Sequence, residues 1–139
     1  MPTERTLTII KPDGVAANLT GAILQHLEQA GFRIKGLRRL HLSAAQAEAF
    51  YAVHRERGFF NDLVKFMTEG PVVTAVLERE NAVAELRKAM GATDPAKAEA
   101  GTLRKLYATS IERNVIHGSD AAETARQEIG FFFAQADLL

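Results

Sequence analysis

The sequence predicts a single domain of the α/β (α+β) class, in which helices cover a four-stranded antiparallel sheet. Three observations lead to this prediction. The length of 139 residues suits one domain, assigned to residues 1–139. An apolar fraction of 47% is enough to form a hydrophobic core. Segments with the periodicity of strands and of helices follow one another along the chain, without an internal repeat or a linker.

The first two predicted elements are a strand and a helix. Thr and aliphatic residues alternate over Arg5–Ile10, which predicts a strand, and Lys11-Pro12-Asp13-Gly14 predicts the turn that ends it. Thr20 is a suitable N-cap for the next helix, because its hydroxyl can accept a hydrogen bond from a free backbone N–H. Gly31 fits the C-terminal end of that helix.

A second strand and a capped helix come next. One parity of the second strand is occupied by Ile34, Gly36, Arg38, Leu40 and Leu42, and Gly36 weakens this prediction. Ser43 and Gln46 have the spacing of a capping box, in which each side chain bonds to a backbone N–H of the other end. The helix behind this box has a face that carries Ala47, Phe50, Tyr51 and His54.

The centre of the chain predicts a buried strand between two helices. A short helix is expected over 60–68, followed by a strand at Pro71–Leu77 that is apolar on both parities and therefore central in the sheet. Asn81 is the expected N-cap of the helix that follows. The polar loop Gly91–Arg104 is long for a compact domain, and long ordered loops are usually functional.

The last predicted elements are a short strand and a helix. The strand lies within Ile111–Ile116, Asp120 and Glu123 form a second capping box, and Gly130 is expected to break the helix. The order strand, helix, strand, helices, strand, helix, strand, helix matches the split βαββαβ pattern called ferredoxin-like. This fold does not by itself indicate a function.

Composition excludes several classes of protein. Seventeen basic side chains balance seventeen acidic ones, which argues against a dedicated nucleic-acid or membrane-surface binder. The absence of Cys excludes disulfide frameworks, thiolate metal sites and cysteine nucleophiles. The N-terminal residues lack the pattern of a targeting segment, and no stretch approaches the ~20 apolar residues that span a membrane. We therefore expect a cytoplasmic protein without membrane partners.

The segment Arg113–Asp120 is the most informative for chemistry. His117 ends a short apolar stretch, Gly118 permits a tight turn, and Ser119 and Asp120 are expected to open a helix. A histidine beside a helix N-terminus lies in a field that favours anions such as phosphate. Neutral imidazole is also a usable nucleophile near pH 7. From these residues alone, a nucleophilic histidine and a structural histidine at a capped helix are comparable interpretations.

Other polar residues lie near predicted turns or helix ends. Lys11, Arg87 and Arg104 could contact phosphate oxygens, and Thr93 in the long loop can donate a hydroxyl hydrogen bond. Phe59 follows Gly58 at a loop-to-helix boundary, where an exposed ring could stack on a base. Each residue taken singly is more often a solvated charge or a packed side chain.

The motifs together resemble the nucleoside diphosphate kinase family of the bacterial type, from Glu4 to about Phe133. Five pieces in the family's order and spacing make the resemblance specific. They are Arg5–Gly14, Gly70-Pro71-Val72-Val73, Met90-Gly91-Ala92-Thr93-Asp94-Pro95, Gly101-Thr102-Leu103-Arg104 and Asn114–Asp120.

The resemblance implies a ping-pong phosphotransfer that maintains nucleoside and deoxynucleoside triphosphate pools. His117 would take the γ-phosphate of a nucleoside triphosphate, typically ATP, and pass it to a nucleoside diphosphate. Glu128 would fix the tautomer of the imidazole, Ser119 would support the histidine, and Lys11 and Tyr51 would lie near the phosphoryl group. A straight helix from residue 120 would place Glu128 ~12 Å beyond its start, so the contact requires the preceding chain to run back alongside the helix.

The resemblance also implies the nucleotide contacts. Mg²⁺ would enter bound to the nucleotide phosphates, with no direct protein ligand and at most a water-mediated contact from Asp120. The family is oligomeric, which implies a homo-oligomer, either a tetramer or a hexamer. The implied nucleotide-binding residues are Arg87, Thr93 and Arg104 for the β- and γ-phosphates, Lys11 and Asn114 for the sugar hydroxyls, and Phe59 and Ile111 for the base.

Several positions depart from the family's usual residues. Gly58 replaces a Pro, Ala100 stands where Pro is common, Lys105-Leu106 replaces a small residue followed by Asp, and Arg113 adds a positive charge. None of them removes a residue with an implied chemical role, so we expect retained activity. Three alternatives stay open: a catalytically silent nucleotide-binding or regulatory module, a nucleic-acid binder that uses its sheet, and a phosphohistidine phosphatase.

Overall fold

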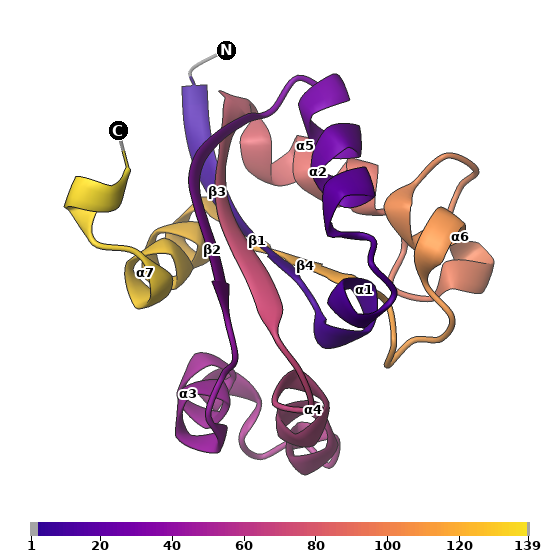
Figure 1. Cartoon of the computed structure of the whole chain (residues 1–139), viewed down its shortest axis with the longest axis vertical. Coiled ribbons are helices and arrows are strands. Elements are labelled where there is room, and N and C mark those ends of the chain that lie inside the picture. Colours follow the sequence, from indigo (N-terminus) through magenta and orange to yellow (C-terminus); the bar gives the residue numbers. More distant parts are fainter. Residues whose placement is uncertain (1–2, 139) are drawn as a thin grey trace.

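The fold is a four-stranded antiparallel sheet with helices on both faces (Figure 1). The computed structural model describes residues 3–138. The strands are β1 (Thr3–Ile10), β2 (Arg33–Leu40), β3 (Val72–Glu80) and β4 (Ile116–Gly118), in the spatial order β2-β3-β1-β4. Every neighbouring pair is antiparallel. The predicted ferredoxin-like class is therefore confirmed.

Seven α-helices connect or flank these strands within the described residues. None of the helices in this part of the chain has the length and apolar character required to cross a membrane. The helices are α1 (Pro12–Ala16), α2 (Thr20–Gln29), α3 (Ala44–Phe50), α4 (Phe60–Met67), α5 (Ala82–Met90), α6 (Leu103–Tyr107) and α7 (Ala122–Phe132), with short 3₁₀ turns at Ala52–His54, Pro95–Lys97 and Gln135–Asp137.

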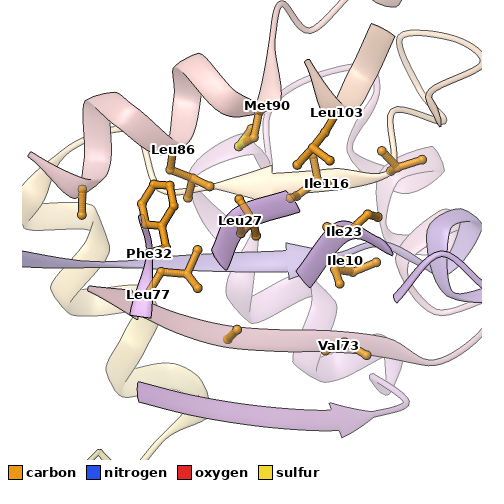
Figure 2. Packing of buried hydrophobic residues seen from close by; sticks show 13 residues of the cluster. Ile10, Ile23, Leu27, Phe32, Val73, Leu77, Leu86, Met90, Leu103 and Ile116 are labelled. Atoms are coloured by element: carbon orange, nitrogen blue, oxygen red, sulfur yellow. The ribbon is translucent and has the colours of Figure 1, made fainter. Parts of the chain in front are cut away.

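Two hydrophobic clusters occupy the two faces of the sheet. Figure 2 shows the cluster under α2 and α5, where Ile10 and Leu77 of the sheet meet Leu27 and Leu86 of the helices. The opposite cluster contains Leu7 and Ile9 of β1 together with residues of α3, α4 and α7. The central strands β1 and β3 supply residues to both clusters, which confirms the prediction of a strand buried on both faces.

The first half of the chain differs from the predictions at element ends. The position before α2 is Leu19, without a side-chain cap, so the expectation that Thr20 is the N-cap was wrong. The backbone N–H of Leu19 donates instead to the Gly14 carbonyl of α1. This hydrogen bond links the end of α1 to the start of α2. The helix after the capping box ends at Phe50, and His54 lies in the following 3₁₀ turn. The capping box of Ser43 and Gln46 itself is confirmed.

The edge strand β2 ends at Leu40, two residues earlier than expected, and its register shifts between Ile34 and Gly36. Gly36 has a packing role, because a Cβ built there would lie 2.8 Å from Leu138 Cδ2 and 3.1 Å from Phe133 Cε1. The C-terminal segment therefore crosses β2 at its glycine. Gly36 weakens the sequence pattern of the strand because its missing side chain makes room for the C-terminal segment.

The start of α5 is capped by a residue distant in sequence. Asn81 holds the N-cap position in a left-handed conformation (φ 54°), but its side chain makes no capping hydrogen bond. The Glu4 carboxylate of β1 accepts a hydrogen bond of 2.8 Å from the Val83 backbone N–H instead. β3 continues to Glu80, beyond the predicted end at Leu77, because it pairs with β1 from Val73 to Glu80.

Three predictions for the last third were wrong in detail. β4 begins at Ile116 and runs to Gly118, because Val115 has a positive φ of 62° that cannot continue a strand. Asp120 and Glu123 do not form a capping box: the Thr124 hydroxyl accepts from the Ala121 N–H and donates to Asp120. Gly130 does not break α7, which packs through residues on either side of it and continues to Phe132.

Candidate active site

His117 lies at the middle of β4 and is held there by the central strand β1. It stands opposite Ile9 in the antiparallel register. The Thr8 hydroxyl donates a 2.7 Å hydrogen bond to the His117 carbonyl, and the Ser119 N–H donates to the Leu7 carbonyl at 3.1 Å. The backbone on both sides of the imidazole is therefore fixed to the buried second half of β1.

Gly118 brings His117 close to α5. The prediction of a tight turn at Gly118 was wrong, because the residue belongs to β4 and the chain bends only at Asp120 and Ala121, before α7. A Cβ built at Gly118 would lie 2.6 Å from Met90 Sδ and 2.9 Å from Leu86 Cδ2. The glycine thus allows close packing between β4 and α5, and the Arg87 guanidinium reaches the Gly118 carbonyl at 3.3 Å.

The His117 imidazole contacts a carboxylate on α7. Its Nε2 lies 2.8 Å from Glu128 Oε1, and the Ser119 hydroxyl donates to the same oxygen at 2.7 Å. The chain leaves β4 and returns along the sheet as α7, which packs against β1, so a residue two turns into the helix comes back to the histidine. The return path that this contact requires is present. Because Nε2 faces Glu128, Nδ1 is the ring nitrogen that remains for other chemistry.

A cleft of about 290 Å³ opens beside His117. It lies between the 3₁₀ turn at Ala52–His54, the helix α5 and the start of α7. Its wall contains arginine side chains and hydroxyl side chains, the two kinds that were expected near the phosphates. The predicted site residues that line it are Tyr51, Arg87, Thr93, Arg104, His117, Asp120 and Glu128.

Lys11 is a buried cation behind this cleft. Its Nζ donates a 2.8 Å hydrogen bond to Asn114 Oδ1, and only 8% of the residue is exposed. Burial, and then the positive charge of Arg104, lower the pKa of Lys11 to about 8, while Asp13 acts in the opposite direction. The charged form of this lysine is therefore poorly stabilised until an anion approaches.

Arg104 is also buried and is held by backbone carbonyls. Its guanidinium donates to the Ile116 carbonyl at 2.7 Å, to Gly91 at 3.1 Å and to Asn114 at 3.4 Å. Burial, and then the charge of Arg87, lower the pKa of Arg104 to about 10. The charge of Arg87 thus disfavours the charged form of Arg104. Such repulsion in a cleft is relieved by a bound phosphate.

Two further polar side chains face the cleft. The Tyr51 hydroxyl is buried and has no hydrogen-bond partner among residues 3–138, and burial followed by the charge of Glu128 raises the pKa of that phenol. The Asp120 carboxylate accepts a 2.7 Å hydrogen bond from Thr124, which is the main reason that its pKa is lowered. A ligand oxygen could satisfy the hydroxyl of Tyr51.

Other predicted site residues lie outside the lining of this cleft. Ser119 and Asn114 are buried behind it and act on it through Glu128 and Lys11. Phe59 and Ile111 are on the surface, 49% and 54% exposed. The Phe59 ring is linked to the cleft by His54, since the two ring centroids are 5.5 Å apart.

Sequence reasoning did not assign Phe50, His54 or Asp13 to the site. The Phe50 ring packs edge-on against the His117 imidazole, with centroids 5.5 Å apart. His54 lines the cleft, and its Nδ1 is buried without a partner in the described part of the chain. The signal was the predicted helix face shared by Ala47, Phe50, Tyr51 and His54, of which only Tyr51 was assigned to the site, through the family resemblance. Asp13 was interpreted as a turn residue, but its carboxylate bonds to the Val115 N–H.

Comparison with known proteins agrees with this geometry. A family model for nucleoside diphosphate kinase matches residues 4–138. Nucleoside diphosphate kinases from Acidiphilium cryptum and Rhizorhabdus wittichii are 60% and 58% identical over 139 residues, covering 100% of this chain and 99% of each relative.

Solved structures give the same result. The Aquifex aeolicus nucleoside diphosphate kinase has a TM-score of 0.97 at 42% identity, covering 99% of this chain and 100% of that chain. The halophilic nucleoside diphosphate kinase from Halobacterium salinarum, in complex with CDP, has a TM-score of 0.95 at 38% identity, covering 99% of this chain and 92% of that chain. The resemblance inferred from the sequence motifs is confirmed, and the chain belongs to the nucleoside diphosphate kinase family.

Proposed function

We propose that this chain transfers the γ-phosphate of a nucleoside triphosphate, typically ATP, to a nucleoside diphosphate through a phosphohistidine at His117. The observation that carries the proposal is the contact between His117 Nε2 and Glu128 Oε1 at 2.8 Å. It holds the imidazole in one orientation beside a cleft with a cationic wall and keeps Nδ1 free of this partner. The carboxylate also stabilises the positive charge that develops on the ring during attack.

The proposed reaction has two balanced halves. The Nδ1 lone pair of His117 attacks the γ-phosphorus, an N–P bond forms, and the bond from phosphorus to the β-phosphate bridging oxygen breaks with its electrons on the leaving diphosphate. In the second half a terminal oxygen of a different nucleoside diphosphate attacks the phosphohistidine and releases the imidazole. The proton stays on His117 Nε2 throughout, because Glu128 Oε1 accepts a hydrogen bond from it. The Ser119 hydroxyl donates to the same carboxylate oxygen and fixes its position.

The cationic wall supports binding of the polyphosphate. Arg87, Thr93 and Arg104 line the cleft, and we assign them to the β- and γ-phosphates. Lys11 and Tyr51 approach the transferred group, because each is a buried polar side chain with capacity for an anion or its oxygens. Phosphoryl transfer depends mainly on positioning and charge neutralisation, which this arrangement supplies.

We place the sugar against the buried Lys11–Asn114 pair and the base at the outer surface. The Lys11–Asn114 pair can contact sugar hydroxyls, since Asn114 retains acceptor capacity and Lys11 retains donors. Phe59 and Ile111 are half exposed and offer apolar surface for the base. Stacking without edge recognition accommodates every base, because each has a π-face. The CDP bound to the Halobacterium salinarum relative supports nucleotide binding here.

The residues around the cleft fit a Mg²⁺ ion that arrives with the nucleotide. Within residues 3–138, no group of three or more His, Cys, Asp or Glu side chains is placed to hold a metal ion. Asp120 lines the cleft with one oxygen bound to Thr124, so it can contact a hydrated cation through water. Mg²⁺ bound to the phosphates would neutralise part of their charge, while the cationic side chains neutralise the remainder.

We also propose a cytoplasmic homo-oligomer, a tetramer or a hexamer. Two features support a partner on the sheet edge: β2 has an unpaired edge, and Leu37 on it is 54% exposed. Sedimentation equilibrium of the purified chain would measure its mass directly. A mass equal to one chain at micromolar concentration would contradict this assembly.

Intact-mass spectrometry tests the phosphohistidine. The protein is mixed with Mg-ATP without acceptor, and then GDP is added. We expect a gain of one phosphoryl group that disappears on adding GDP, with GTP formed in equal amount. His117→Asn should show no gain, whereas the exposed His41→Asn should behave as the wild type. Wild-type protein that binds ATP but gains no phosphoryl group would contradict the mechanism and favour a catalytically silent nucleotide-binding module.

A further inference from the structure

Val115 has a backbone conformation that its side chain disfavours. Its φ is 62°, and it is 2% exposed. The other non-glycine residues with positive φ in the described part of the chain are Asn18 and Asn81, and asparagine tolerates this region. A β-branched residue in the left-handed region is strained and persists only when its surroundings hold it. Val115 lies two residues before His117, so its conformation sets the path by which the chain enters β4.

The turn after β1 holds both backbone groups of Val115. The Lys11 N–H donates to the Val115 carbonyl at 2.8 Å, and Asp13 Oδ2 accepts from the Val115 N–H at 3.1 Å. Gly14 adds a close approach, because a Cβ built there would lie 3.4 Å from the Val115 carbonyl oxygen and 3.0 Å from Ile10. One peptide unit on each side of Val115 is therefore fixed by a segment about 100 residues distant in sequence.

Among residues 3–138, the Asp13 carboxylate makes one hydrogen bond, the one to the Val115 N–H. Its Oδ1 is buried and has no hydrogen-bond partner among residues 3–138. Burying a carboxylate oxygen is costly unless the group gains a strong interaction elsewhere. The hydrogen bond to the Val115 N–H is that interaction, and a charged acceptor makes it stronger than a neutral one.

The conformation of Val115 orients the groups that hold the cationic wall. Asn114 accepts from Lys11 through its side chain and from Arg104 through its carbonyl. The Ile116 carbonyl accepts a second hydrogen bond from Arg104 at 2.7 Å. A rotation of the peptide units around Val115 would turn these carbonyls away and displace His117 at the same time.

We propose that Asp13 is a positioning residue that clamps Val115 in its left-handed conformation and so places His117 and Arg104 for phosphoryl transfer. The inference rests on the proposed function of His117. It assigns to Asp13 a mechanical role through the backbone, distinct from its electrostatic influence on Lys11. A glycine at position 115 adopts positive φ without strain and does not need the clamp.

A double-mutant cycle tests this role. The measured quantity is the rate of phosphoryl gain by His117 with Mg-ATP, in Asp13→Ala, Val115→Gly and the double variant. We expect Asp13→Ala to slow the reaction by about tenfold to a hundredfold in the Val115 background. In the Val115→Gly background we expect the same substitution to slow it by less than about threefold. Asp62→Ala, on the exposed face of α4, is the matched control and should match the wild type.

Two results would overturn the clamp. One is an equal loss from Asp13→Ala in both backgrounds, which would mean that Asp13 acts through the charge of Lys11. The other is no loss in either background. Asp13→Asn separates the two roles further, since it keeps an acceptor oxygen but removes the charge. The clamp predicts a rate at pH 7 within about threefold of the wild type, and the lost charge should only shift the alkaline limb set by Lys11 to lower pH.

Hydrogen exchange keeps this test independent of the proposed reaction. Amide exchange of residues 114–118 is expected to be at least about tenfold faster in Asp13→Ala, while exchange in β3 stays as in the wild type. Unchanged exchange over 114–118 would contradict the clamp even if His117 proved never to be phosphorylated. If the wild type gains no phosphoryl group but exchange rises as expected, the proposed function fails and the clamp stands.

Discussion

Raising the pH above 8 is expected to weaken nucleotide capture through Lys11. Burial and the charge of Arg104 lower its pKa to about 8, so the empty site holds a charged Lys11 below this pH and a neutral one above it. The value of kcat/KM follows the ionisation of the free enzyme. If only the charged form captures Mg-ATP productively, kcat/KM at pH 8 is about half its pH 7 value, and at pH 9 about one tenth.

The kcat value should change much less over the same range. Once the polyphosphate is bound, its negative charges raise the pKa of Lys11, so the lysine remains protonated at pH 9. Quenched-flow measurement of phosphoryl gain from pH 6.5 to 9.5, at constant ionic strength, separates the two parameters. Lys11→Arg is the control, because a guanidinium stays charged throughout this range. A flat wild-type kcat/KM, or an identical fall in Lys11→Arg, would refute the reasoning.

The same pKa has the opposite consequence for folding. Between pH 8 and 10.5 the unfolded chain keeps a proton on Lys11 that the folded chain has lost, so this group raises the free energy of unfolding as the pH rises. The fall in pKa corresponds to roughly 3 kcal/mol of destabilisation when Lys11 is charged. Urea unfolding of wild type and Lys11→Met should therefore differ in pH dependence, and parallel curves would contradict the assigned burial cost.

Three substitutions test other parts of the site and its support. Glu128→Gln should slow phosphoryl gain by about a hundredfold while ATP affinity stays near wild type, because the amide no longer stabilises the imidazolium. Quenched flow measures the rate and equilibrium binding measures the affinity. An unchanged rate would remove Glu128 from the mechanism. Gly118→Ala should lower the free energy of unfolding by about 1–3 kcal/mol, since the new Cβ meets Met90 and Leu86; equal urea midpoints would mean that α5 yields without cost. Gly58→Pro should stabilise the fold by about 0.4–1 kcal/mol, because Gly58 is exposed and a Cβ there would have no atom within 4 Å. Calorimetry measures the change in Tm. A lower Tm would show that the backbone at Gly58 is incompatible with proline.

The sequence predicted most of the sheet because its strands are marked by local patterns. Arg5–Ile10 alternates in a way that only a strand accommodates, and Pro71–Leu77 is apolar on both parities because β3 supplies both hydrophobic clusters. The Ser43–Gln46 box was also found correctly, since both of its hydrogen bonds are made within four residues. Structural features that depend on residues close together in sequence could therefore be predicted.

Features decided by distant contacts were not predicted. The start of β4 was placed too early because Val115 has a positive φ, and its N–H bonds to Asp13, which lies 102 residues away in sequence. The cap of α5 comes from Glu4, 79 residues from the N–H that it binds. No periodicity or capping pattern contains such a pair. In both cases a side chain on or next to β1 satisfies the backbone of another segment.

The candidate site shows the same division. His117 stood out from its own segment, but the sequence alone left a nucleophile and a structural residue as comparable interpretations. Its partner Glu128 was named only through the family resemblance, because nothing local shows that α7 returns along β1. The cationic residues were likewise suggestive only as a group. Their meeting around one cleft depends on the sheet order, which brings β4 and α5 together.

The groups that destabilise this protein are concentrated around its cleft. Lys11 and Arg104 are buried cations with lowered pKa values, the Tyr51 hydroxyl is buried without a protein partner among residues 3–138, and Val115 is strained. Each of the first three is relieved by a negatively charged oxygen-rich ligand, whereas the strain of Val115 is not. A bound polyphosphate would therefore relieve the polar groups, whereas the hydrogen bonds from the turn after β1 hold the strained Val115 whether or not the cleft is occupied. The two apolar clusters under the sheet supply the stability that this arrangement requires.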